Sequence, residues 1–174
     1  MLTSIGILIL RLVIGLFVAA HGAQKLLGWF GGGGFSGTTR MMEAQGFRPN
    51  WLWALLASVG EFGGGLFLAL GLLTPLAAAA IIGVMLMAVL KVHLSKGFWN
   101  SKGGLEFPTT LGVVAFVIGL IGPGSYAIDT LIGLALAWPL YLLLVLIAIV
   151  VVLGGYVASN QVLSHKAREQ QPAV

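Results

Sequence analysis

Five long apolar stretches divide the chain, and charged residues are almost confined to the segments between them. The stretches cover about residues 4–27, 51–73, 75–94, 107–121 and 128–158. A helix needs roughly 20 residues to cross the ~30 Å hydrocarbon core of a bilayer. The first three stretches meet this length, the fourth is short, and the fifth is long and contains Pro139, so it could form two pieces. The pattern predicts an all-α integral membrane helical bundle, with a four-helix core over residues 1–130 and an additional C-terminal segment over 128–158.

Basic residues mark one side of this predicted bundle. If successive stretches alternate in direction, eight of the nine Lys and Arg residues fall on one side, which we call the basic face. They are Lys25, Arg40, Arg48, Lys91, Lys96, Lys102, Lys166 and Arg168. The connections on the opposite face carry no Lys or Arg. The positive-inside rule therefore predicts a cytoplasmic basic face, with the N-terminus outside and a cytoplasmic tail over 159–174.

Composition supports a membrane protein and narrows its chemistry. Hydrophobic residues make up 59% of the chain, charged residues 8%, and the mean hydropathy is +1.04. A soluble domain of this size could not hide so much apolar surface. The net charge of +4 follows from the basic face, so we expect no nucleic-acid partner. Because the sequence has no cysteine, a redox role would need a bound cofactor, a quinone or a partner protein.

Prolines, glycines and capping residues punctuate the apolar stretches. Thr74 and Pro75 have the pattern of an N-cap followed by proline at the first helical position, which predicts a tight connection between two helices. Within the loop 28–50, Ser36 is predicted to cap a short surface helix over 37–45. We expect one bundle without a separate soluble domain.

Two ionisable side chains are predicted inside the membrane. Glu61 lies near the middle of the second stretch, where an unpaired carboxylate costs at least ~2.5–3.5 kcal/mol. Arg11, in the first stretch, is the expected partner, because matching helix depths places it about five residues, or roughly 7–8 Å, from the level of Glu61. The pair is either structural or part of a proton-carrying or ligand-binding site; alternatively, the Arg11 side chain extends to the face opposite the basic one. Next to Glu61, Gly60 and Gly64 have the spacing of closely packed membrane helices.

A second group of polar residues is predicted to form a mouth at the basic face. His21 and Lys25 are four residues apart and therefore share one face of the first helix. Donors ringed by aromatic side chains would suit the head group of a quinone, with its tail between helices; alternatively, Trp and Lys here are ordinary interfacial anchors. The candidate proton-relay residues are Glu61, His21 and His93, and the candidate ligand-binding residues are Arg11, Lys25, Lys91, Glu106 and Trp99. We expect no metal site.

Several short motifs occur in a fixed order between residues 5 and 130. They are the segment 11–32, Glu61-Phe-Gly-Gly-Gly, Leu72-Leu-Thr-Pro, Val92-His-Leu, Gly103-Gly-Leu-Glu-Phe-Pro and Gly122-Pro-Gly-Ser-Tyr-Ala-Ile-Asp. Together they resemble the DoxX family of small bacterial membrane proteins. The resemblance implies a four-helix bundle in the bacterial inner membrane. It also implies a role like that of a thiosulfate:quinone oxidoreductase small subunit, or of a membrane anchor for oxidoreductases that deal with thiol and oxidative stress.

Three functional hypotheses follow, each with the lipid bilayer as a direct partner. The first is a quinone-interacting membrane component of an oxidoreductase system. The second is a non-catalytic anchor that recruits a soluble oxidoreductase through the loops 28–50 and 95–102 or the tail. The third is a small transporter or lipid-binding protein, which would favour a homo-oligomer because five helices enclose little space.

Overall fold

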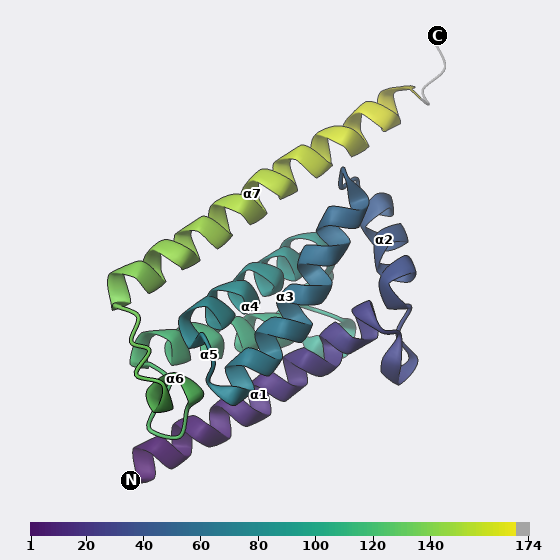
Figure 1. Ribbon diagram of the computed structural model, residues 1–174. Coiled ribbons are helices and arrows are strands. Elements are labelled where there is room, and N and C mark those ends of the chain that lie inside the picture. Colours follow the sequence, from purple (N-terminus) through teal and green to yellow (C-terminus); the bar gives the residue numbers. More distant parts are fainter. Residues whose placement is uncertain (170–174) are drawn as a thin grey trace.

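The computed structural model describes residues 1–169, and every regular element among them is helical (Figure 1). The α-helices are α1 (Leu2–Leu26), α2 (Gly34–Ala44), α3 (Asn50–Leu70), α4 (Thr74–Ala88), α5 (Glu106–Ile121), α6 (Ile128–Leu131) and α7 (Trp138–Glu169). The rod of α4 continues through a π-helical turn, η2 (Val89–His93), and a 3₁₀ turn, η3 (Leu94–Lys96). Two further 3₁₀ turns are η1 (Trp29–Gly31) and η4 (Asn100–Lys102). The all-helical fold predicted from the apolar stretches is confirmed.

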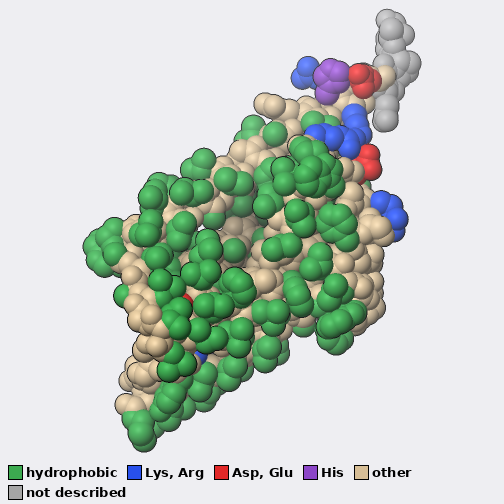
Figure 2. Space-filling model, viewed as in Figure 1, with side chains coloured by type: hydrophobic (Ala, Val, Ile, Leu, Met, Phe, Trp, Pro, Cys, Tyr) green, Lys and Arg blue, Asp and Glu red, His purple; other side chains and the backbone are tan. Residues whose placement is uncertain are grey.

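Four of the helical rods within residues 1–169 are long and apolar enough to cross a membrane: α1, α3, α4 as extended to Lys96, and α7. The fifth apolar helix, α5, has 16 residues and is shorter than these. Large apolar side chains cover much of the outer surface, as expected for a protein in contact with lipid (Figure 2). Figure 2 also shows Lys and Arg side chains gathered at the end of the molecule where α2 and the C-terminal part of α7 lie.

Helix α4 lies at the centre of the bundle. It packs against α3, α5 and α7, while α1 packs mainly against the other side of α3 (Figure 1). The main core between these helices is apolar and includes Leu68, Ile81, Ile118 and Tyr141. Tyr141 also donates a hydrogen bond from its hydroxyl to a carbonyl of α5, at 3.0 Å, which ties the start of α7 to the bundle.

Glycines set the contact between α1 and α3. A Cβ atom at Gly15 would collide with the backbone of Ala69, and one at Gly22 would collide with the backbone of Phe62. The two antiparallel helices therefore touch backbone to backbone, as small residues allow in membrane proteins. These contacts also fix depth, because Gly22 must lie level with Phe62 and Gly15 near the level of Ala69.

The fifth apolar stretch forms two pieces. The short helix α6 and an irregular segment over 132–137 precede α7, and Pro139 is the second residue of α7, where a proline is well tolerated. Helix α7 then continues to Glu169, through most of the predicted tail; residues 170–174 of that tail lie outside the described range.

The start of α4 is capped from a distance. The helix begins at Thr74 with Pro75 in its first turn, and its N-cap residue is Leu73. The prediction that Thr74 is the N-cap is therefore wrong, and the Thr74 hydroxyl has no hydrogen-bond partner among the described residues. The cap is the carboxylate of Asp129 on α6, which accepts hydrogen bonds from the backbone N–H groups of Leu73, at 2.7 Å, and Thr74, at 2.8 Å. This contact satisfies backbone donors that have no partner within the helix and places a negative charge at the positive end of the helix dipole. The short helix α2 begins at Gly34, three residues before its predicted start, so the prediction that Ser36 caps it is wrong: Ser36 lies inside the helix and the N-cap residue is Gly33.

Candidate functional site

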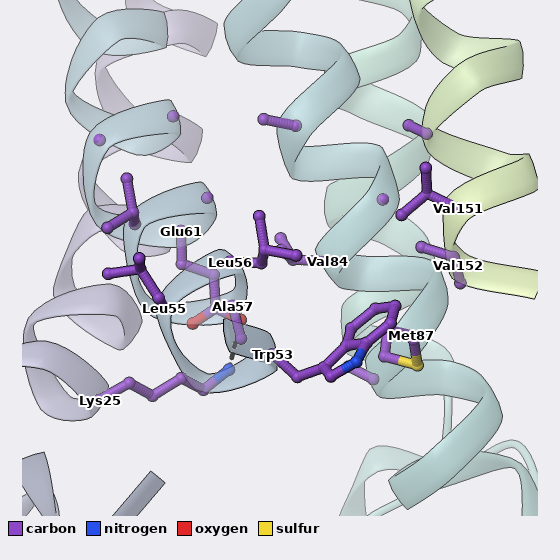
Figure 3. A pocket seen from close by; sticks show the side chains of 18 of the residues that line it. Lys25, Trp53, Leu55, Leu56, Ala57, Glu61, Val84, Met87, Val151 and Val152 are labelled. Carbon is purple, nitrogen blue, oxygen red and sulfur yellow. Dashed lines mark hydrogen bonds and ion pairs between the residues drawn. The ribbon is translucent and has the colours of Figure 1, made fainter. Parts of the chain in front are cut away.

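A partly buried ion pair joins α1 to α3. The ammonium of Lys25, in the last turn of α1, donates to the Oε1 atom of Glu61, near the middle of α3. Figure 3 shows the Lys25 side chain extending from α1 to the Glu61 carboxylate. The Glu61 side chain is only 2% exposed, whereas that of Lys25 is 29% exposed. A carboxylate at this depth requires a partner, and Lys25 supplies it.

The ion pair borders an apolar groove of about 590 Å³. Helices α3, α4 and α7 form its walls, and α1 contributes Lys25 (Figure 3). Met41 and Met42 of α2 and Gln45, which follows α2, line the basic-face end. This volume lies within the range of small-molecule sites. The rim carries exposed apolar side chains, including Val59 on α3 and Val151 on α7. The groove therefore opens sideways, toward the position of the lipid tails.

Among the described residues, the charged groups that line the groove are Lys25 and Glu61, which lie at one level. Lys25 uses one of its three ammonium donors in the contact with Glu61, which leaves donors for an acceptor in the groove. The second carboxylate oxygen, Oε2 of Glu61, is buried and has no hydrogen-bond partner among residues 1–169. A buried polar atom without a hydrogen-bond partner is uncommon in a folded protein, so the position of Glu61 Oε2 requires a structural or functional reason.

Trp53 closes the groove on the basic-face side. Its indole packs against Gly155 of α7, where a Cβ atom would collide with the ring, and lies at a 4.9 Å centroid distance from the ring of Phe47. The Trp53 side chain also lies next to Met87 of α4 (Figure 3). The groove therefore has an aromatic side chain, Trp53, and a thioether side chain, Met87, at its end near Lys25. Such polarisable side chains accommodate planar rings.

The predicted pairing of Arg11 with Glu61 is wrong. Arg11 is fully buried, but its guanidinium donates to the backbone carbonyls of Pro123, at 2.7 Å, and Tyr126, at 2.5 Å, at the opposite face. Glu61 lies level with Gly22 because of the close α1–α3 contact. Arg11 is about 11 residues from that level, or ~16 Å along the helix, which is too far for its side chain.

The remaining candidate residues are spread over the basic face, each with its own local contact. His21 Nδ1 lies 3.2 Å from Gln24 Oε1, and its ring packs edge-on against Phe107. His93 Nδ1 lies 2.7 Å from the Gly103 carbonyl oxygen. Neither histidine lines the groove, and neither contacts Glu61 within residues 1–169.

Three further candidates also make contacts away from the groove. Lys91 donates to Asn160 Oδ1 at 2.8 Å and lies 5.3 Å from the ring centres of both Phe47 and Tyr156, so it fastens α7 to the bundle. Glu106 Oε2 accepts the backbone N–H of Asn100 at 2.9 Å. Trp99 is 62% exposed and suits the role of interfacial anchor that the sequence left open. Over the described part of the chain, no group of three His, Asp or Glu residues could hold a metal ion.

The residues that complete the groove carried little signal in the sequence. Met41, Met42 and Met87 are ordinary apolar residues there, and only the folded chain shows that they meet Trp53 and Lys25 around one cavity. The run of glycines beside Glu61 is the feature of the sequence that indicates a groove there, because small residues let a helix or a ligand approach the backbone.

The helices and their apolar surface define a multi-pass helical membrane protein with a charged pair beside a groove that faces lipid. Residues 6–94, just over half of the chain, match the family described as DoxX, and the chain belongs to that family. It is also 31% identical to the inner membrane protein YqjF of Escherichia coli (strain K12), over 76% of this chain and 95% of YqjF. The protein is thus a multi-pass inner membrane protein. No solved structure matches the chain.

Proposed function

We propose that this protein is a quinone-interacting membrane component of an oxidoreductase system. The observation that supports this most directly is the apolar groove, open toward lipid, with the Lys25–Glu61 pair at its polar level. A membrane quinone matches this arrangement, because its ring carries hydrogen-bond acceptors while its tail is apolar. Other membrane amphiphiles share the apolar tail, and the planar ring is what favours a quinone beside Trp53 and Met87.

The residues of the groove would divide the work of binding. Lys25 would donate to a ring carbonyl, and Glu61 would hold the ammonium in place and balance its charge. Trp53 and Met87 would pack against the ring. A bound quinone would supply the electron-carrier chemistry that the side chains of this chain lack, since the chain has no cysteine. The Oε2 atom of Glu61, which is buried without a partner among residues 1–169, would be the group to take up and release a proton near the ring.

In this proposal the basic face lies in the cytoplasm and the N-terminus lies outside. Eight of the nine Lys and Arg residues on one face support that orientation. Electrons would be exchanged with a soluble oxidoreductase that docks on the basic face.

A second candidate function, a non-catalytic anchor for such an oxidoreductase, is supported by a separate observation. The connections at the basic face expose large aromatic side chains: Trp29, Phe30, Phe98 and Trp99. Aromatic residues are enriched in protein interfaces as well as at membrane surfaces. An anchor would keep its partner after the Lys25–Glu61 pair is neutralised, whereas loss of the loop 95–102 would release the partner.

Quinone content in lipid extracts of the purified protein tests the proposal. The wild-type protein is expected to retain quinone and to bind added decylubiquinone. The double variant Lys25→Met/Glu61→Gln, which removes both charges together, is expected to lose binding by about tenfold or more, the effect of a hydrogen bond to a charged group. Lys102→Met is the matched control, because Lys102 lies on the basic face away from the groove. A wild-type protein without quinone that ignores added decylubiquinone would contradict the proposal.

A further inference from the structure

The two ends of the groove differ in the size of their side chains. The end toward the basic face contains Trp53, Met87, Met41 and Met42. From the level of Glu61 toward the opposite face, small residues of α3 and α4 line most of the groove, and Phe67 and Leu76 lie at its far end. We call this part the small-residue half, after Gly60, Gly63, Gly64, Ala77, Ala80 and Gly83. Lys25 and Glu61 lie where the two ends meet.

The packing of α3 on α4 gives the small-residue half its length. A Cβ atom at Gly60 would lie 2.8 Å from Val84 Cγ1, and one at Gly64 would lie 3.4 Å from Ile81 Cγ1. Glu61 is therefore level with about Gly83 of α4. From that level the groove continues to Leu76, seven residues earlier, which corresponds to roughly 10 Å of helix.

Gly63 is the informative position, because helix packing does not account for its small size. Its neighbours Gly60 and Gly64 face α4 at short distance. A Cβ atom at Gly63 would meet only Val59 of its own helix, at 3.7 Å, among the described residues within 4 Å. Gly63 nevertheless lines the groove. A glycine there keeps space open inside the groove and does not bring two helices together.

Helix α7 closes one side of the small-residue half. Ala148, Val151 and Val152 form its third wall. Two contacts hold α7 in place on either side of this wall: Tyr141 against α5, and Lys91 with Asn160 at the basic-face end. Helix α7 also lies outside residues 6–94, the part that matches the family.

We propose that the small-residue half is the subsite for the tail of the quinone, and that the ligand lies lengthwise with its ring beside Lys25 and Trp53. The tail then runs along Gly63 toward the opposite face, between α3 and α7. This inference rests on the proposed function, since it assigns the orientation of the same ligand. The surrounding lipid tails are as apolar as the groove, so the hydrophobic effect does not favour the quinone tail in the groove over the lipid phase. The tail is instead selected by its fit to the shape of the groove.

Photo-crosslinking of the full-length protein in lipid nanodiscs tests the orientation. One decylubiquinone probe carries a diazirine at the end of the tail, and a second carries it on the ring. The tail probe is expected to label the groove walls near Gly63 on α3 and near Ala77 on α4. The ring probe is expected to label Trp53 or Met87. Tail labelling at Met41 or Met42, or on the outer surface of α7, would overturn the proposed orientation.

A pair of glycine variants provides the second readout. Gly63→Leu fills the tail subsite and is expected to lower tail-probe labelling about tenfold, the cost of overpacking a formed cavity. Gly154→Leu is the control, because a Cβ atom there meets no described atom within 4 Å and the residue does not line the groove. Equal labelling in both variants would also overturn the inference. The wild-type labelling pattern stands even if Gly63→Leu fails to fold.

The outcomes separate this inference from the proposed function. If neither probe gives labelling that excess decylubiquinone competes away, the proposed function fails and the subsite fails with it. If the ring probe labels Trp53 or Met87 while the tail probe labels elsewhere, the quinone proposal stands and only the tail subsite is lost.

Discussion

Each charged side chain inside the bundle is neutralised in a different way. Glu61 pairs with Lys25 across α1 and α3, next to the groove. Arg11 is held by two backbone carbonyls, with the charge of Asp129 nearby. An unpaired charge at membrane depth costs several kcal/mol, so both arrangements contribute to stability. Only the first lies beside the groove that faces lipid, whereas Asp129 and Pro123 line a second cavity of about 470 Å³ at the opposite face. The two sites are therefore expected to respond differently to mutation.

Neutralising only one member of the Lys25–Glu61 pair should be worse than neutralising both. Lys25→Met leaves the buried Glu61 carboxylate without its cation and is expected to lower the free energy of unfolding by about 3 kcal/mol. The double variant Lys25→Met/Glu61→Gln buries no unpaired charge and should recover most of that loss. Thermal unfolding of the three proteins in detergent measures this difference. A double variant less stable than Lys25→Met would show that the pair is not the main interaction of Glu61.

The capping carboxylate of Asp129 should have a purely structural role. Asp129→Asn keeps the shape of the side chain but removes the charge that faces Arg11 and the N-terminus of α4. We expect a loss of about 1–2 kcal/mol of unfolding free energy, since this position combines a helix cap with a dipole interaction. Thermal unfolding measures the loss, and decylubiquinone binding should be unchanged. A variant with normal stability but lost binding would place Asp129 in the ligand site and contradict this division.

At the scale of helices, backbone contact between α1 and α3 determines which side chains meet. Gly22 of α1 lies directly against the backbone of α3, so Gly22→Ala must separate the helices or deform one of them. The expected loss is about 1–3 kcal/mol of unfolding free energy, together with weaker quinone retention as Lys25 moves relative to Glu61. Gly6→Ala is the matched control, because a Cβ atom there meets nothing within 4 Å in the described structure. Equal stability of the two variants would contradict the assigned contact.

This same contact explains which features the sequence could predict. The apolar stretches identify α1, α3 and the α4 rod because length and composition alone decide whether a helix can cross a bilayer. The partner of Glu61 was missed because matching the centres of two helices assumes that they are level. The backbone contact at Gly22 sets the position of α1 along α3, and in that position Lys25, and not Arg11, reaches Glu61. A single sequence carries no direct signal of that shift.

At the scale of the whole molecule, charge is distributed unevenly between the two ends of the bundle. The basic side chains gather at the end that also holds α2 and the C-terminal part of α7 (Figure 2). The opposite end holds α6 and the turn 122–125, which contain no Lys or Arg, and the Arg11 guanidinium that reaches this end is buried. The tail subsite and the ring subsite lie along this same axis. The orientation of the protein therefore decides on which side of the membrane the ring would exchange protons.

Because the native chain has no cysteine, single cysteines can report this orientation directly. Ser125→Cys lies in an exposed turn at the end opposite the basic face, and Ser101→Cys lies in the exposed turn η4 at the basic face. In intact spheroplasts, a membrane-impermeant maleimide is expected to label Ser125→Cys but to label Ser101→Cys only after permeabilisation, with the cysteine-free protein as the blank. The physical reason is that a cytoplasmic position is favoured for lysine-rich connections. The reverse labelling pattern would place the ring end of the groove outside the cytoplasm, and a soluble cytoplasmic oxidoreductase could then not be its electron partner.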